Sequence, residues 1–112
     1  MISNDFQHII KLIDEKLRER ARSRGEVDQG REWILARTVK FAEESGELAG
    51  EVLTTLGSQR EEKINEQSKD DLGSEIADVL ITTLLVAKSL GVDVNESLRR
   101  KVEKIRNRFR ID

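Results

Sequence analysis

The twelve residues from Ile76 to Ala87 constrain the fold of this chain more than any other segment. Their order is Ile-Ala-Asp-Val-Leu-Ile-Thr-Thr-Leu-Leu-Val-Ala, so a helix formed here is apolar on nearly all sides. Such a helix needs other helices around it, and no proline occurs in the 112 residues to interrupt them. The sequence therefore predicts an all-α fold, a four-helix-bundle-like arrangement in which residues 76–87 form a central, buried helix.

Four segments repeat apolar residues at steps of three and four, which is the spacing of one helix face. They predict helices over residues 4–22, 32–56, 69–90 and 93–109, with a polar loop over residues 57–69. Asn4 is a candidate N-cap of the first helix, and Asp93 followed by Glu96 matches a capping box.

No repeat or second domain is visible, so we expect one domain over residues 1–112. A helix that is apolar all round is difficult to enclose with three neighbours, so we also expect a homo-oligomer, a dimer or a dimer of dimers.

The residue types that are missing or balanced exclude several classes of protein. No run of about eighteen apolar residues is present to span a membrane. Zero cysteines exclude disulfides, thiolate zinc sites and a cysteine nucleophile, and a single histidine, His8, argues against histidine-ligated metal centres. Twenty basic against twenty-two acidic residues do not indicate a general nucleic-acid binder. We expect a cytoplasmic protein without a membrane or stable nucleic-acid partner.

Asp78 is the one charged residue inside the apolar segment, and Glu75 lies in the same narrow sector of the helix. An ionised carboxylate among apolar residues costs several kcal/mol unless it is paired. The helix before it carries Glu44 and Glu47 on one face, and Lys40 joins them four residues before Glu44. If the two helices pack antiparallel, these four carboxylates face one another. Mg²⁺ and Mn²⁺ favour oxygen ligands and would relieve the repulsion between them.

Simpler explanations are open for each acid taken alone. Glu-rich helix faces are usually solvated surface, and Glu75, near a helix start, favours the helix macrodipole. Asp78 could instead pair with a buried arginine or lysine of the fourth helix. The spacing E-E-x-x-E followed by E-x-x-D on an apolar helix is more specific than any one of these residues.

These two segments resemble the MazG-like proteins, the all-α nucleoside triphosphate pyrophosphatases. The stretch Lys40-Phe41-Ala42-Glu43-Glu44-Ser45-Gly46-Glu47 is similar to their E-E-x-x-E segment, and Ser74-Glu75-Ile76-Ala77-Asp78 is similar to their E-x-x-D segment. The resemblance covers roughly residues 33–109. Relatives often have an asparagine where Ile105 stands and, in the deoxycytidine triphosphatase type, an aromatic residue where Thr82 stands. These departures concern the base pocket and not the metal site.

The resemblance implies Mg²⁺-dependent hydrolysis of a nucleoside or deoxynucleoside triphosphate to the monophosphate and pyrophosphate, and a role in cleansing the nucleotide pool. It implies that the metal ligands are Glu44, Glu47, Glu75 and Asp78. Glu43 and Glu44 are the candidate catalytic acids, with Glu43 either binding a second metal or orienting water. A basic residue of the last helix that matches Lys101 contacts phosphate in relatives. From the residues themselves we add Lys40, Lys104 and Trp33 as candidate substrate-binding residues, although Trp33 could equally pack in the core.

Two other functions remain open at this point. The acidic face of the second helix, which carries Glu44 and Glu47, could bind a basic partner, which would make the chain a non-catalytic helical interaction module. The same fold could also act on phosphoribosyl-ATP, as in the related enzyme of the histidine pathway. Stabilisation by Mg²⁺ or Mn²⁺ separates an enzyme from an interaction module, because a bound ligand favours the folded state.

Overall fold

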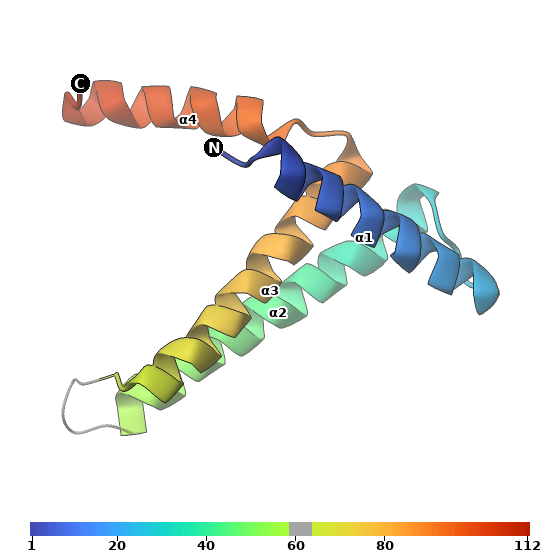
Figure 1. Cartoon of the computed structure of the whole chain (residues 1–112), viewed down its shortest axis with the longest axis horizontal. Coiled ribbons are helices and arrows are strands. Elements are labelled where there is room, and N and C mark those ends of the chain that lie inside the picture. The colour runs from blue at the N-terminus through green and yellow to red at the C-terminus, as the bar shows by residue number, and fades with distance from the viewer. Residues whose placement is uncertain (59–63) are drawn as a thin grey trace.

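The computed structural model describes residues 1–58 and 64–112, and it is all-helical over these ranges. Its four helices are α1 (Asn4–Ser23), α2 (Gly30–Ser58), α3 (Glu66–Leu90) and α4 (Val94–Phe109), shown in Figure 1. The all-α class and the four predicted helices are confirmed. The predicted loop over 57–69 is shorter than expected, because α2 continues to Ser58 and α3 begins at Glu66; residues 59–63 of that loop lie outside the described residues.

The helix starts use side-chain caps, as the sequence suggested, with one correction. Asp93 caps α4 by accepting a hydrogen bond of 3.1 Å from the backbone N of Glu96. At α1 the predicted cap, Asn4, is wrong by one residue: Ser3 is the N-cap, and its Oγ accepts from the backbone N of Phe6 at 3.1 Å. Ser and Asn are equally good caps, so two adjacent candidates cannot be separated by residue type.

The antiparallel pair α2–α3 forms the long arm of the molecule, and α1 crosses this arm where α2 begins and α3 ends (Figure 1). From that end α4 turns away and diverges from the pair. The first turn of α4 is attached to the N-terminus by two hydrogen bonds between Ile2 and Asn95, of 3.0 and 2.9 Å. None of the helices in the described ranges combines the length and apolar character that a membrane span requires.

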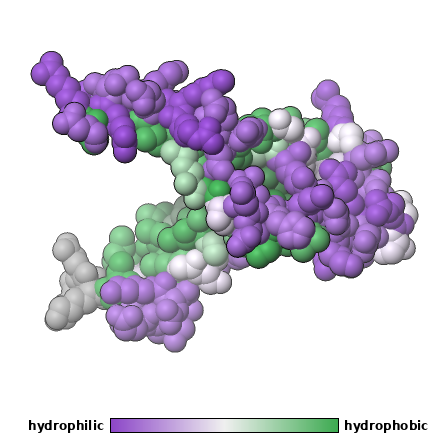
Figure 2. Space-filling view, turned by 45° about the horizontal axis from the view of Figure 1, so that its top comes forward, coloured by the Kyte–Doolittle hydropathy of each residue, from purple (hydrophilic) through white to green (hydrophobic). Residues whose placement is uncertain are grey.

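The expectation that α3 is buried on all sides is wrong for the single chain. Leu85, on the side that α1 and α2 cover, is only 6% exposed, whereas Leu80 is 58% exposed and Ile76 46% exposed. The reason is that α4 does not fold back over α3, so the far side of α3 has no neighbour. Figure 2 shows apolar side chains along the α2–α3 arm, beside the open space that separates this arm from α4.

These exposures lead to a stability prediction. We expect Leu85→Ala to lower the free energy of unfolding by about 2–5 kcal/mol, because it removes a buried side chain and leaves a cavity. Leu53→Ala, on the 73%-exposed Leu53 of α2, should change it by no more than about 0.5 kcal/mol. Urea unfolding of both variants as dilute monomers measures the difference. Equal losses would contradict this division between covered and open faces.

Candidate metal centre

Three carboxylates meet halfway along the α2–α3 pair. Oxygen atoms of Glu44 on α2 and of Glu75 and Asp78 on α3 all lie within 4.8 Å of one another. Their environments differ, since Glu44 is buried at 8% exposure, Glu75 is half-buried and Asp78 is exposed. Asp78 was expected in an apolar interior; it is instead on the open side of the arm. The acid that the fold buries is Glu44.

Glu75 bears the largest electrostatic cost of this arrangement. Its pKa is raised above the ordinary 4.5, first by removal from water and then by repulsion from Glu47, Asp78, Glu44 and Glu51 in that order. One carboxylate oxygen, Oε2, is buried and has no hydrogen-bond partner within the described ranges. A buried acceptor without a donor is unfavourable, so this site is incomplete as the protein alone provides it.

Lys40 supplies positive charge at one edge of the acids. Its Nζ lies 3.1 Å from Oε1 of Glu44 and 3.9 Å from Oε2 of Glu43. The hydrogen bond to Glu44 and the attraction of that carboxylate raise the pKa of Lys40, so the ammonium form is retained. Glu43 is exposed and stands beside Lys40, outside the group of three acids.

Glu47, also predicted as a ligand, lies next to the group but is not part of it. Its side chain is exposed, and among the neighbouring charges it contributes most to raising the pKa of Glu75. The structure therefore brings together three of the four predicted ligands and leaves the fourth at their border. Glu51, one turn further along α2, acts on Glu75 in the same direction.

The other predicted substrate-binding residues are dispersed. Lys101 and Lys104 are exposed on α4, and no hydrogen bond or ion pair of the described residues joins either to the three acids. Trp33 is half-buried near the start of α2, and the guanidinium carbons of Arg37 and Arg18 lie 4.5 and 5.4 Å from the centre of its ring. Trp33 therefore packs against two cations. Packing was the alternative to substrate binding that the sequence left open for this residue.

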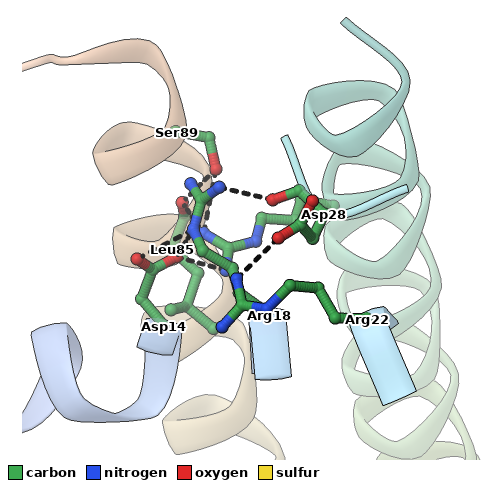
Figure 3. A network of polar contacts seen from close by, with 7 residues as sticks. Asp14, Arg18, Arg22, Asp28, Leu85 and Ser89 are labelled. Carbon is green, nitrogen blue, oxygen red and sulfur yellow. Dashed lines mark hydrogen bonds and ion pairs between the residues drawn. The ribbon is translucent and has the colours of Figure 1, made fainter. Parts of the chain in front are cut away.

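A buried polar network around Asp14 and Arg37 was missed by the sequence analysis. Asp14 is 5% exposed and Arg37 7% exposed, and Oδ1 of Asp14 accepts a hydrogen bond of 2.5 Å from Nη2 of Arg37. Arg18 donates from Nε to the same carboxylate at 3.2 Å. Figure 3 shows Asp14, Arg18, Leu85 and Ser89 converging where α1 meets α3. The sequence did contain a signal for this network: Asp14 interrupts the apolar stripe of α1, just as Asp78 interrupts the apolar segment of α3, and a buried acid needs a partner.

The acidic group has the donors that a hard divalent cation requires. It offers carboxylate oxygens from two helices, one of them a buried oxygen without a hydrogen-bond donor, and neighbouring acids that repel one another. Mg²⁺ and Mn²⁺ bind such oxygen sets, and their charge would offset the repulsion. The residues therefore fit a divalent metal.

The raised pKa of Glu75 gives a pH-dependent prediction for the metal-free protein. Because this pKa is higher in the folded chain, Glu75 favours folding below pH 4.5, and that contribution is lost as the pH rises through the folded value. We expect Glu75→Gln to raise the melting temperature at pH 7 and to change it less at pH 4. Thermal unfolding in a chelator at both pH values measures this. A variant that melts lower than the wild type at pH 7 would contradict the repulsion.

Comparison with known proteins agrees with this geometry. The model of the MazG-like family matches residues 35–112, which include α3, α4, Lys40 and every acid of the site. No curated protein and no solved structure matches the chain. The matched region is more than half of the sequence and contains the complete acidic group on the helices where the two motifs were found. The chain belongs to the MazG-like family.

Proposed function

We propose that this protein is a Mg²⁺-dependent nucleotide pyrophosphohydrolase, which converts a nucleoside or deoxynucleoside triphosphate to the monophosphate and pyrophosphate. The observation that carries the proposal is the group formed by Glu44, Glu75 and Asp78, with oxygens within 4.8 Å of one another. Membership of the MazG-like family supports a pyrophosphatase-type activity. A role in cleansing the nucleotide pool of the cytoplasm would follow from this activity.

The metal would be held by Glu44, Glu75 and Asp78, with Glu47 at the border of the group. Mg²⁺ is the expected ion, and Mn²⁺ could replace it because both take oxygen ligands. When bound, such a cation neutralises phosphate charge and lowers the pKa of coordinated water. The unpartnered Oε2 of Glu75 supports this assignment, since a ligand bond would satisfy it.

The other charged residues act on the substrate and on water. Lys40 is placed to donate from Nζ to a phosphate oxygen, beside the carboxylate of Glu44 that it now contacts. Glu43 is exposed next to Lys40 and would orient the attacking water and accept its proton. The water oxygen attacks the α-phosphorus, the bond from that phosphorus to the bridging oxygen breaks, and pyrophosphate leaves with the electron pair.

A shallow cavity beside Lys40 is the proposed place for the base and sugar. It measures about 210 Å³, lies between α1 and α2, and has Trp33, Arg37 and Lys40 on its α2 side. Nε1 of Trp33 is buried and has no hydrogen-bond partner in the described part of the chain. Lys40 lines this cavity and also contacts Glu44 of the acidic group. A nucleotide could therefore place its phosphates at the acids while its base contacts the Trp33 region.

The open faces of the chain support a homo-oligomer, and a dimer is the simplest form. Apolar side chains are exposed on α3, at Ile76 and Leu80, and on α4, at Ile105 and Phe109. α4 is rich in basic side chains, whereas the open side of the α2–α3 arm carries the acids. This charge complementarity favours a second copy that lays its α4 against the arm. Lys101 and Lys104 of α4 would then reach the phosphates from the neighbouring chain.

The metal ligands give the first test of this function. We expect Asp78→Asn and Glu47→Gln each to abolish metal-dependent release of pyrophosphate from a panel of nucleoside triphosphates. Both proteins should fold, because each substitution is nearly isosteric and both side chains are exposed. The increase in melting temperature that millimolar Mg²⁺ causes in the wild type should also disappear, because the ligand charge is removed.

Asp70→Asn is the matched control for these variants, since Asp70 is an exposed aspartate on α3 outside the acidic group. It should retain both the activity and the stabilisation by Mg²⁺. Pyrophosphate release by both ligand variants at the wild-type rate would refute this active site. A wild type that neither gains stability from Mg²⁺ nor releases pyrophosphate would favour the non-catalytic interaction module.

The oligomeric state gives a second test. Light scattering at micromolar concentration should give at least twice the 12.8 kDa mass of one chain. Leu80→Glu should shift the protein toward the monomer, because it places a charge on the open apolar face of α3. Glu15→Gln, on an exposed acid of α1, is the control and should not change the mass. A wild type of 12.8 kDa would contradict the dimer.

A further inference from the structure

Arg37 makes the polar contacts that fix α2 against α3 at the end of the arm where α2 begins and α3 ends. Its Nη1 donates to the backbone oxygen of Leu85 and to Oγ of Ser89, each at 2.9 Å. Its Nη2 donates to Asp14 of α1, and its guanidinium lies over the ring of Trp33 at 4.5 Å. One buried side chain of α2 is thus bound to α1 and to two positions on α3, so three helices meet at it.

The spacing of these contacts matches the spacing of the metal centre. Arg37 precedes Glu44 by seven residues on α2, and Leu85 follows Asp78 by seven residues on α3. In an antiparallel pair, equal steps of two helical turns, about 10 Å, lead from the contact between Arg37 and Leu85 to the one between Glu44 and Asp78. The same register places Glu47 level with Glu75. The alignment that Arg37 imposes is therefore the alignment that the metal ligands need.

The acids cannot impose this register themselves. Oxygens of Glu44, Glu75 and Asp78 lie within 4.8 Å of one another, and Glu47 and Glu51 add negative charge on the same face of α2, so the acids repel one another. Without a cation, a small displacement of α2 along α3 or away from it would lower that repulsion. Burial of apolar surface alone specifies the register weakly, because the hydrophobic effect is not directional. Arg37 resists it strongly, because a displacement would leave a buried guanidinium and a buried carboxylate without partners.

We propose that Arg37 is a positioning residue of the metal centre: through Leu85 and Ser89 it sets the axial register in which the acids of α2 and α3 form one cation site. Asp14 and Trp33 hold the guanidinium in place for this purpose. The inference rests on the proposed function, because it concerns the same acids. Because Arg37 also lines the cavity proposed for the base, its positioning role is tested on the metal alone, without nucleotide.

The test measures the affinity of the folded protein for Mn²⁺ alone, from the electron paramagnetic resonance signal of the free ion, well below the melting temperature. Arg37→Met should raise the dissociation constant by about 10- to 100-fold, the usual effect of removing a group that supports metal ligands. If this variant does not fold, Arg37→Lys replaces it. That variant keeps a charge for Asp14, but its shorter ammonium lacks the planar fork that spans both helices, so it should also bind Mn²⁺ at least tenfold more weakly.

Two controls separate register from general stability. Arg22→Met removes an arginine of the same network, which pairs with Asp28 at 2.6 Å; no hydrogen bond or ion pair joins it to α3 in the described part of the chain. Ile10→Ala removes a side chain of α1 that is 5% exposed and should lower the melting temperature. Both should bind Mn²⁺ within about twofold of the wild type, since neither contact sets the register.

Each outcome supports or overturns the proposal. If the wild type and Arg37→Met bind Mn²⁺ equally, the positioning role is wrong and the proposed function stands. If Ile10→Ala loses as much affinity as Arg37→Met, the loss reflects stability and the positioning role is also wrong. If the wild type itself binds no Mn²⁺, the metal centre and the proposed function fail together. A loss confined to the Arg37 variants supports the proposal.

Discussion

The ion pair between Asp14 and Arg37 is the interaction on which the arrangement of the first three helices depends. Both residues are buried, and burial of two charges costs several kcal/mol that their attraction repays only with good geometry and further hydrogen bonds. Here further bonds are present: Arg18 donates to Asp14, and Leu85 and Ser89 accept from Arg37. Burial lowers the pKa of Arg37, and the bond to Asp14 opposes this, so the cation is kept. Such a network adds little net stability, but few alternative arrangements would satisfy it.

The acidic group stands in contrast to that network, although α2 and α3 contribute to both. In the network Asp14 is paired with two arginines, although Nε of Arg37 has no hydrogen-bond partner among the described residues, whereas Glu75 has acids around it. Lys40 compensates only part of this charge, through Glu44. Unfavourable groups that the rest of a fold holds in place are typical of functional sites. The difference between paired opposite charges and grouped like charges therefore distinguishes the support from the site.

Much of this architecture could be predicted from the sequence, because helix periodicity depends on near neighbours. The four helices and the pairing of Glu44 with Glu75 and Asp78 follow from spacing within and between two helices. The exposure of Asp78 did not follow, because a helix that is apolar on nearly all sides does not indicate which of its sides the other helices of the chain cover. The partnership of Asp14 with Arg37 also did not follow. It joins residues 23 positions apart on different helices, and nothing in the local pattern says which cation a buried acid meets.

The position of α4 explains both the exposed apolar side of α3 and the separation of basic residues from the acids. The short turn after α3 and the bonds between Ile2 and Asn95 direct α4 away from the arm, so its basic residues are separated from the acids in one chain. The same separation exposes the apolar side of α3 around Leu80. In the proposed dimer one contact would bring basic residues to the acids and cover the exposed side of α3. The apolar stripe of α4, with its basic flanks, would lie on the apolar face of α3 next to the acids. The single chain thus pairs its opposite charges at its Arg37 end, whereas along the arm it leaves like charges and an apolar face, where a metal and a second copy are proposed to bind.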